Sequence, residues 1–164
     1  GNSLKGRIIL GELGHITIKS GGKKCTCGNQ GCLEAYASGC ALTKETKRVM
    51  ALRIKDVEGV QGNLSTVDPK LVFTTQKGDE SANKILNRFI SFLGDGLISI
   101  IPSFRPEAII LAGGITKENE CLLAQLKRKH YGFVSDLLPR PKVLVSSYFN
   151  ELGIYGAASL VLDS

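Results

Sequence analysis

The chain has 164 residues, which is enough for one well-buried domain but short for two. Its composition, 43% hydrophobic and 22% charged, is ordinary for a globular protein, and no apolar run approaches the ~20 residues of a membrane helix. The net charge of +6 does not predict nucleic-acid binding by itself, because the basic residues are scattered and aromatic residues do not interleave with them. The first residues show no apolar segment followed by a small-residue cleavage site, so they do not predict a signal peptide. Because the chain begins with glycine, we expect a fragment, a processed chain or the remnant of a tag.

The five cysteines do not read as a disulfide framework. Three lie close together at Cys25, Cys27 and Cys32, whereas Cys40 and Cys121 fall in apolar, helix-like stretches. An odd count with a metal-like cluster favours a reducing compartment, so we expect a cytoplasmic protein.

Taken in chain order, the first predicted elements are short strands at 8–10 and 16–18, followed by a helix that begins just after Cys32 and runs to about Met50. Residues 55–70 are rich in turn formers and predict a loop, with a short helix after Pro69. The longest predicted helix runs from Asp79, its candidate N-cap, to Ile101. Its apolar stripe predicts a core helix, and Pro102 should end it.

The continuous apolar run at 108–112 is typical of a strand that is buried on both faces, and Gly113-Gly114 ends it. A helix over 117–130, a buried strand over 143–145 and a closing helix over 153–162 complete the prediction. This alternation of helices and strands indicates an α/β layer in which part of the sheet is parallel.

One imidazole and three thiols form the most informative cluster of the sequence: His15, Cys25, Cys27 and Cys32. Zinc prefers four tetrahedral nitrogen and sulfur ligands, and a closed set of this kind is a structural site. Gly28 and Gly31 permit the tight turns that such a loop requires. The alternative is that the cysteines are merely small loop residues. If zinc binds, nearby Lys19, Lys23 and Lys24 offset the negative charge of its three thiolates.

Two carboxylates, Glu12 and Glu34, flank these ligands. An isolated glutamate is usually solvated surface, but a metal-ordered loop would fix both groups. Carboxylates accept strong hydrogen bonds from hydroxyls, so a sugar is the natural ligand for the pair. His15 has a second ring nitrogen that is free to donate to a sugar oxygen.

The turn at Gly113 and Gly114 follows an apolar strand and precedes a helix. Such a turn lets a nucleotide approach the backbone closely, although glycine pairs are also common in turns without any ligand.

These motifs resemble the ROK family of bacterial-type sugar kinases and repressors, which belongs to the actin-like ATPase superfamily. The resemblance is carried by Gly11-Glu12-Leu13-Gly14-His15, by the run from Cys25 to Ser38, by Leu111-Ala112-Gly113-Gly114-Ile115 and by Gly156-Ala157-Ala158. It extends over about residues 11–162, and only the cysteine motif is specific to the family.

The resemblance implies an α/β lobe of the ribonuclease H-like, actin-like ATPase type, with a mixed sheet, flanking helices and a zinc-binding loop. It implies that residues 1–164 are the C-terminal lobe and that an N-terminal phosphate-binding lobe is absent. By the same resemblance, zinc would be bound by His15, Cys25, Cys27 and Cys32. The sugar would be contacted by Glu12, His15 and Glu34. ATP would lie beside Gly113 and Gly114. The complete enzyme would phosphorylate a hexose or N-acetylhexosamine with Mg²⁺, and a homodimer is expected.

The sequence departs from the family in having neither an Asp-x-Gly-x-Thr phosphate loop nor an Asn-Asp pair, whose aspartate is the family's general base. We therefore expect no catalytic residue in this chain and no turnover by it alone. Two other interpretations stay open: the sugar-sensing lobe of a repressor, which would bind nucleic acid through another domain, and a non-catalytic module stabilised by zinc.

Overall fold

The computed structural model describes residues 12–55, 68, 71–75, 78–115, 122–126 and 141–146. The elements in chain order are the 3-10 turn η1 (Leu13–His15), helices α1 (Glu34–Ala37), α2 (Gly39–Lys55), α3 (Leu71–Thr75) and α4 (Glu80–Phe104), and strands β1 (Ala108–Leu111) and β2 (Lys142–Val145). Residues 122–126 are also helical. The predicted strand 8–10, the closing helix 153–162, Cys121 and most of the loop 55–70 lie outside the described residues.

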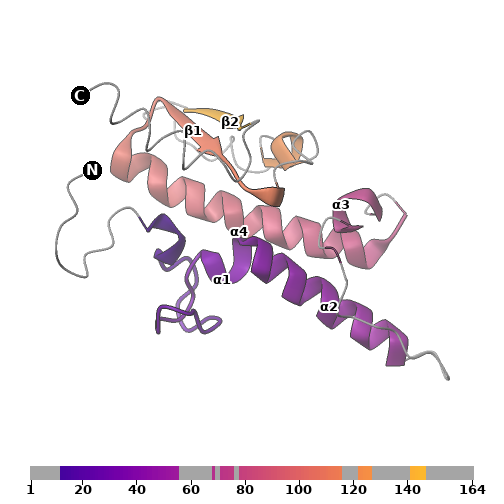
Figure 1. Cartoon of the computed structure of the whole chain (residues 1–164). Helices are drawn as coiled ribbons and strands as arrows, with labels where there is room; N and C mark the ends of the chain where they lie inside the picture. The colour runs from indigo at the N-terminus through magenta and orange to yellow at the C-terminus, as the bar shows by residue number, and fades with distance from the viewer. Residues whose placement is uncertain are drawn as a thin grey trace.

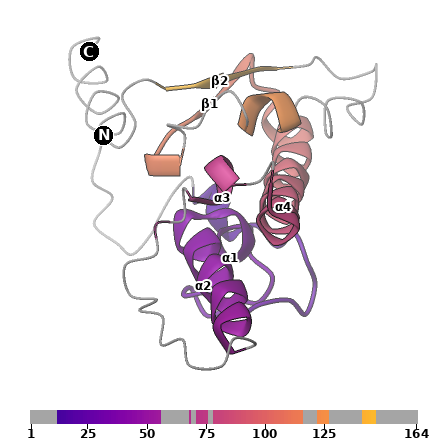
Figure 2. The same ribbon diagram turned by 90° about the vertical axis from the view of Figure 1, so that its right-hand side faces the viewer.

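Helix α4 is the central element, with the strands on one side and α1 and α2 on the other (Figures 1 and 2). Asp79 caps it as predicted: its Oδ1 accepts hydrogen bonds from the backbone N–H groups of Ser81 at 2.8 Å and Ala82 at 3.0 Å. The predicted apolar stripe is the core, and its most buried members are Ala82, Ile85, Leu86, Phe89, Ile90, Leu97 and Ile101.

The prediction that Pro102 ends this helix is wrong. The helix continues to Phe104, and Arg105 then adopts the left-handed conformation with a φ of 45°. A proline removes its own N–H donor and crowds the carbonyl four residues earlier, but the residues after it can still close the turn. Here the backbone N–H of Arg105 donates to the carbonyl of Ile101 at 2.8 Å.

By length and composition alone, α4 is apolar enough to cross a membrane, which the absence of a long unbroken apolar run did not predict. Its apolar face packs against other helices of the described structure, and α1, α2 and α3 all contact it. A buried core helix passes the same compositional test, so this feature is weak support for a membrane segment.

The helix predicted after Cys32 is interrupted at Ser38. That residue is extended, with φ −104° and ψ 165°, and separates α1 from α2. Its hydroxyl oxygen accepts a hydrogen bond from the backbone N–H of Ala41 at 3.1 Å. Serine competes with helical backbone bonds in this way, so it begins a new helix instead of continuing the old one.

The two described strands are parallel, with Ala108 opposite Lys142 and Leu111 opposite Val145. This confirms a parallel portion of the sheet, whereas the mixed sheet remains a prediction. One face is buried through Val143, but Ile110 and Leu144 are 54% and 48% exposed, so burial of both faces is not seen within the described residues. The strand predicted at 16–18 is only an isolated bridge between Thr17 and Cys32.

The cap of α4 gives a pH-dependent prediction. A bidentate hydrogen bond from Arg53, assisted by the backbone N–H groups of Ala82 and Ser81, holds the pKa of Asp79 below its usual value. A lowered pKa in the folded state stabilises the fold above the unfolded value of about 3.9, and this contribution is lost as the pH falls through the folded value.

We expect Asp79→Ala to lower the Tm at pH 7 by about 2–4 °C, because both the cap and the ion pair are lost. Asp79→Asn keeps a capping oxygen and should lower the Tm less. Thermal melts between pH 7 and pH 2 check the prediction. A wild-type advantage over Asp79→Asn that persists unchanged at pH 2 would contradict it.

Candidate metal centre and the clefts beside it

A short antiparallel pairing brings His15 to the cysteines. Backbone hydrogen bonds run from Ile18 N to Gly31 O and from Leu33 N to Ile16 O, each 2.9 Å long. They place the end of η1 directly beside Cys32, which is fully buried. The histidine therefore approaches the thiols because residues 16–18 run alongside residues 31–33.

The cysteine loop, residues 23–32, is closed by its own backbone. The N–H of Cys25 donates to the carbonyl of Asn29 at 2.8 Å, and the N–H of Gly28 donates to the carbonyl of Cys25 at 3.1 Å. Gly31 has a φ of 82°, and any side chain there would overlap the carbonyl oxygen of Lys19. A glycine is required at this position, because the loop and the preceding segment touch through backbone atoms.

The four predicted ligand atoms lie within 4.8 Å of one another. The Cys27 and Cys32 sulfurs are 3.7 Å apart, and Nδ1 of His15 is 3.4 Å from the Cys25 sulfur. Standard zinc bond lengths place tetrahedral ligands ~3.8 Å apart for two sulfurs and ~3.6 Å apart for sulfur and nitrogen. The donor set therefore fits a tetrahedral zinc ion in its chemistry, and these two distances are close to those of a tetrahedral site.

The thiols have unequal proton affinities. The backbone N–H of Cys27 is the main cause that lowers the pKa of Cys25 to about 6, whereas burial raises the pKa of Cys32 to about 11. Cysteine binds metals as the thiolate, so a metal that binds here must displace a proton from Cys32.

Of the two predicted carboxylates, the structure brings one into contact with the cluster. Glu34 lies in the first turn of α1, with Oε2 3.5 Å from Nδ1 of His15. Glu12 immediately precedes η1 and its side chain is exposed. Among the described residues, Glu12 makes no side-chain hydrogen bond or ion pair with His15 or Glu34.

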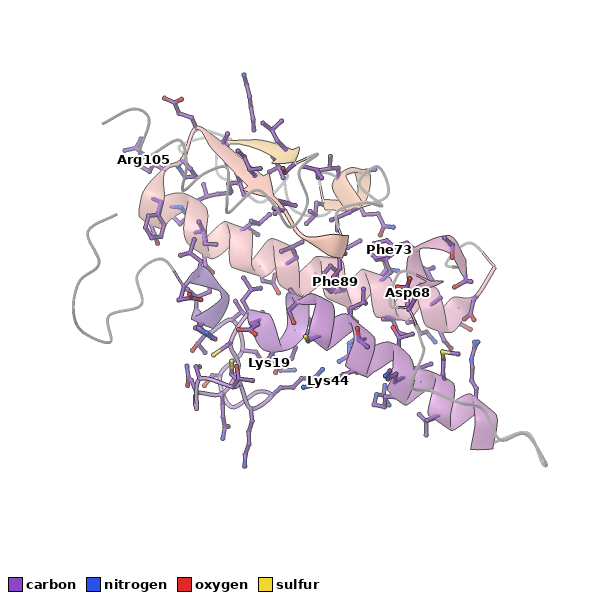
Figure 3. The ribbon with its side chains drawn as sticks, viewed as in Figure 1. Lys19, Lys44, Asp68, Phe73, Phe89 and Arg105 are labelled. Atoms are coloured by element: carbon purple, nitrogen blue, oxygen red, sulfur yellow. The ribbon has the colours of Figure 1, made fainter. Side chains whose placement is uncertain are left out.

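The predicted glycine turn forms one wall of an apolar cleft of about 1020 Å³. Gly113 has a φ of 112°, which favours glycine at the turn after β1. The opposite wall is the junction of α1 and α2, and Phe89 of α4 lies between them (Figure 3). The sequence indicated the glycines but missed this second wall, which consists of Ala37, Ser38, Gly39, Cys40 and Thr43.

A second, polar cleft of about 820 Å³ lies between the cysteine loop and the start of α2. It is lined by Glu34 and Thr26 and by the lysines Lys23, Lys24 and Lys44. Lys19 and Lys44 lie on the same side of the molecule, near the loop (Figure 3). Ser38 and Cys40 line both clefts, so α1 and its C-terminal break separate the polar cleft from the apolar one.

Sequence reasoning also missed the contacts of Lys23. Its ammonium lies 3.8 Å from a carboxylate oxygen of Glu45 and 5.2 Å from the ring centre of Tyr36. It thus makes contacts within the fold besides any contribution to offsetting thiolate charge. The available signal for these contacts was Tyr36, an aromatic residue two positions after Glu34. Lys23, which contacts it, is distant from it in the sequence.

The comparisons with known proteins agree on one family. The model of the ROK family matches residues 1–164. The glucokinase of Thermotoga maritima is 32% identical over 167 residues, which cover 99% of this chain and 53% of that protein. The xylose repressor of Bacillus subtilis is 32% identical over 154 residues, which cover 93% of this chain and 37% of the repressor.

A solved structure shares the fold. The ROK family glucokinase from Streptomyces griseus, crystallised with glucose and AMPPNP, superposes with a TM-score of 0.74 at 28% identity. The match covers 93% of this chain and 51% of that one, so this chain spans about half the length of that kinase. The likeness confirms part of the expected fold class, an actin-like ATPase fold with helices beside a sheet, whereas the mixed sheet and the zinc-binding loop stay predictions.

The geometry of the cysteine loop predicts that Gly31→Ala destabilises the protein. The added methyl group would overlap the Lys19 carbonyl oxygen, and the left-handed φ costs about 1–3 kcal/mol for a non-glycine residue. A chemical denaturation curve measures the loss. Gly78→Ala is the matched control because a Cβ there meets open space, and an equal loss in both variants would contradict the assignment.

Proposed function

This chain belongs to the ROK family, and from that premise we propose that it forms the sugar- and zinc-binding lobe of an ATP-dependent sugar kinase. The observation that carries the proposal is that the ligand atoms of His15 and three thiols lie within 4.8 Å of one another, with the Glu34 carboxylate beside the histidine. The likeness to a glucokinase solved with glucose and AMPPNP supports a hexose as the acceptor and ATP as the donor. An N-acetylhexosamine is the other acceptor that the family resemblance implies.

Zinc would be held by His15, Cys25, Cys27 and Cys32. Four nitrogen and sulfur ligands leave no open position on the ion, so its role would be structural. Bound zinc would cross-link the cysteine loop to η1 and hold the thiolates. The lysines beside the loop offset the resulting negative charge, and a reducing cytoplasm keeps the thiols available.

Glu12, His15 and Glu34 are the proposed sugar contacts. Nδ1 of His15 faces the Cys25 sulfur, which leaves Nε2 to donate to a sugar oxygen. The Glu34 side chain is 43% exposed beside the histidine, so its carboxylate can accept a hydrogen bond from a sugar hydroxyl while the residue stays in the first turn of α1. Hydrogen bonds to a charged carboxylate are the stronger kind, which suits a ligand made of hydroxyls.

The apolar cleft beside Gly113 and Gly114 is the proposed site for the adenosine of ATP. Its walls are mostly apolar, and the glycines leave the backbone accessible to a phosphate. Transfer of the γ-phosphoryl group also needs Mg²⁺, a phosphate cradle and an oriented base. The sequence contains no Asp-x-Gly-x-Thr and no Asn-Asp, so the reaction requires residues that this chain does not contribute.

The alternative is the sugar-sensing lobe of a transcriptional repressor, which the match to a xylose repressor favours. The DNA sequence upstream of the codons for this chain tests the choice. An Asp-x-Gly-x-Thr and an Asn-Asp pair would support the kinase, whereas a winged helix-turn-helix would support the repressor. A third alternative, a non-catalytic zinc module, would bind zinc but neither sugar nor nucleotide.

We expect one zinc ion per chain by elemental analysis of the purified protein. Removal by a chelator should lower the Tm by about 10 °C or more, because zinc binds only the folded loop. Cys27→Ser should abolish this zinc-dependent shift. Cys40→Ser is the matched control, since Cys40 is a free cysteine outside the cluster. Wild-type protein without zinc, or a Cys27→Ser variant with an intact shift, would refute the site.

A sugar panel tests the ligand class. We expect glucose, N-acetylglucosamine or N-acetylmannosamine to raise the Tm of the zinc-loaded chain. Glu34→Gln should weaken binding of the active sugar about tenfold without changing the Tm of the free protein. Isothermal titration measures the affinity. Glu80→Gln, which alters an exposed carboxylate on α4, should bind as wild type, and equal losses in both variants would contradict the assignment.

A further inference from the structure

A buried tyrosine is hydrogen-bonded to the start of the cysteine loop. The hydroxyl oxygen of Tyr36 accepts a hydrogen bond from the backbone N–H of Lys23 at 2.6 Å, and the side chain is nearly buried. Any side chain at Gly22 would overlap this oxygen. Because Gly22 has no side chain, it leaves room for the hydroxyl. The tyrosine and the glycine therefore both favour the same contact.

The ring of Tyr36 is fixed from two sides. It packs against Phe92 of α4, with ring centres 4.4 Å apart and the planes tilted by 39°. The Lys23 ammonium covers the ring at 5.2 Å and lies near Glu45 of α2. The hydroxyl is thus held in place by the helical core, and the loop docks against it.

The contact leads directly to the proposed metal ligands. Lys23 lies two residues before Cys25, and its carbonyl accepts a hydrogen bond from the N–H of Gly31 at 2.8 Å. Gly31 in turn precedes Cys32. On the other side, Tyr36 lies two residues after Glu34 in the same short helix, α1. A single hydroxyl therefore joins both arms of the loop to the helix that carries the carboxylate.

We propose that Tyr36 is a positioning residue: its hydroxyl holds the cysteine loop against α1, and thereby sets zinc affinity and the placement of Glu34 relative to the metal. The inference rests on the zinc site of the proposed function. It assigns a role to a residue that binds neither metal nor sugar. Outer partners of metal ligands influence metal affinity because they fix the geometry in which the ligands are presented.

The test is Tyr36→Phe in the full chain, which removes one oxygen and keeps the ring. Zinc affinity is measured by competition with a chromophoric chelator. We expect affinity to fall about two- to tenfold, the range for one hydrogen bond. Cobalt substitution gives a second readout, because the visible absorption of a tetrahedral cobalt–thiolate site reports ligand geometry, and the variant spectrum should differ from that of wild type.

Two controls separate positioning from general stability. Thr46→Val also deletes a buried hydroxyl, which donates to the Leu42 carbonyl at 2.9 Å inside α2, and it should leave zinc affinity unchanged. Lys23→Ala removes the ammonium but keeps the backbone N–H, so its effect on zinc affinity should be smaller than that of Tyr36→Phe.

Gly22→Ala provides a second route to the same contact, should Tyr36→Phe fold poorly. Its methyl group would overlap the Tyr36 hydroxyl and would also crowd the Lys19 carbonyl oxygen, so zinc affinity should fall. Only the part of the loss that disappears in the Tyr36→Phe background belongs to the hydroxyl. In the Tyr36→Phe background, the same alanine should cost less than in wild type, because the hydrogen bond is already absent. A double-mutant cycle measures this coupling.

The outcomes are distinguishable. Wild-type zinc binding with weaker binding only in the Tyr36 and Gly22 variants supports the inference. If wild type binds zinc and Tyr36→Phe binds it with unchanged affinity, the inference is overturned but the proposed zinc site stands. The same follows if Tyr36→Phe and Thr46→Val lose zinc affinity equally. Absence of zinc binding by wild type overturns the proposed function and this inference together.

Discussion

The contact between Leu33 and Gly96 determines where the candidate site lies on the fold. A Cβ at Gly96 would come within 2.5 Å of a Leu33 methyl carbon, so the leucine occupies a notch in the surface of α4. Glycine in the middle of a helix costs roughly 0.5–1 kcal/mol relative to alanine, and here the close packing of a buried leucine offsets that cost. Leu33 lies between Cys32 and Glu34, so the notch fixes the last thiol and the carboxylate together.

The central helix of the fold was largely predictable from the sequence. The apolar stripe and the Asp79 cap identified α4, because both signals are local and repeat with the period of a helix. The break at Ser38 was not predictable from periodicity, since the apolar positions continue across it in the same register. What decides it is a single side chain to backbone hydrogen bond at Ala41. The exposed positions Ile110 and Leu144 look identical in sequence to buried ones.

The candidate site was likewise predictable in part and not predictable in the rest. Metal-ligand spacing predicted the meeting of His15 with the cysteines, and the structure places them together, because the ligand types themselves carry the signal. The hydroxyl contact between Tyr36 and Lys23 carried no such signal, because a tyrosine in an apolar stretch reads as core. Likewise, the walls of the apolar cleft at Ser38 and Cys40 depend on the unforeseen break between two helices.

The arrangement is compatible with both classes of relative. Glucokinases and a xylose repressor match nearly the same residues of this chain. The cysteine loop, Glu34 and the two clefts all adjoin α1, and none of these features requires a catalytic base. The proposed ligand-binding unit could be joined to a phosphate-binding lobe or to a DNA-binding domain without rearranging its own contacts.

The contacts of the cysteine loop have a consequence for the order of folding. Those that close it join residues 15–33, whereas the contacts that seat it on the core reach Phe92 and Gly96. Short-range contacts form sooner than distant ones, because less chain entropy is lost in closing them. During synthesis from the N-terminus, the loop and its thiols therefore emerge well before α4 is complete. The loop is thus able to form its own backbone contacts before its contacts with α4 exist.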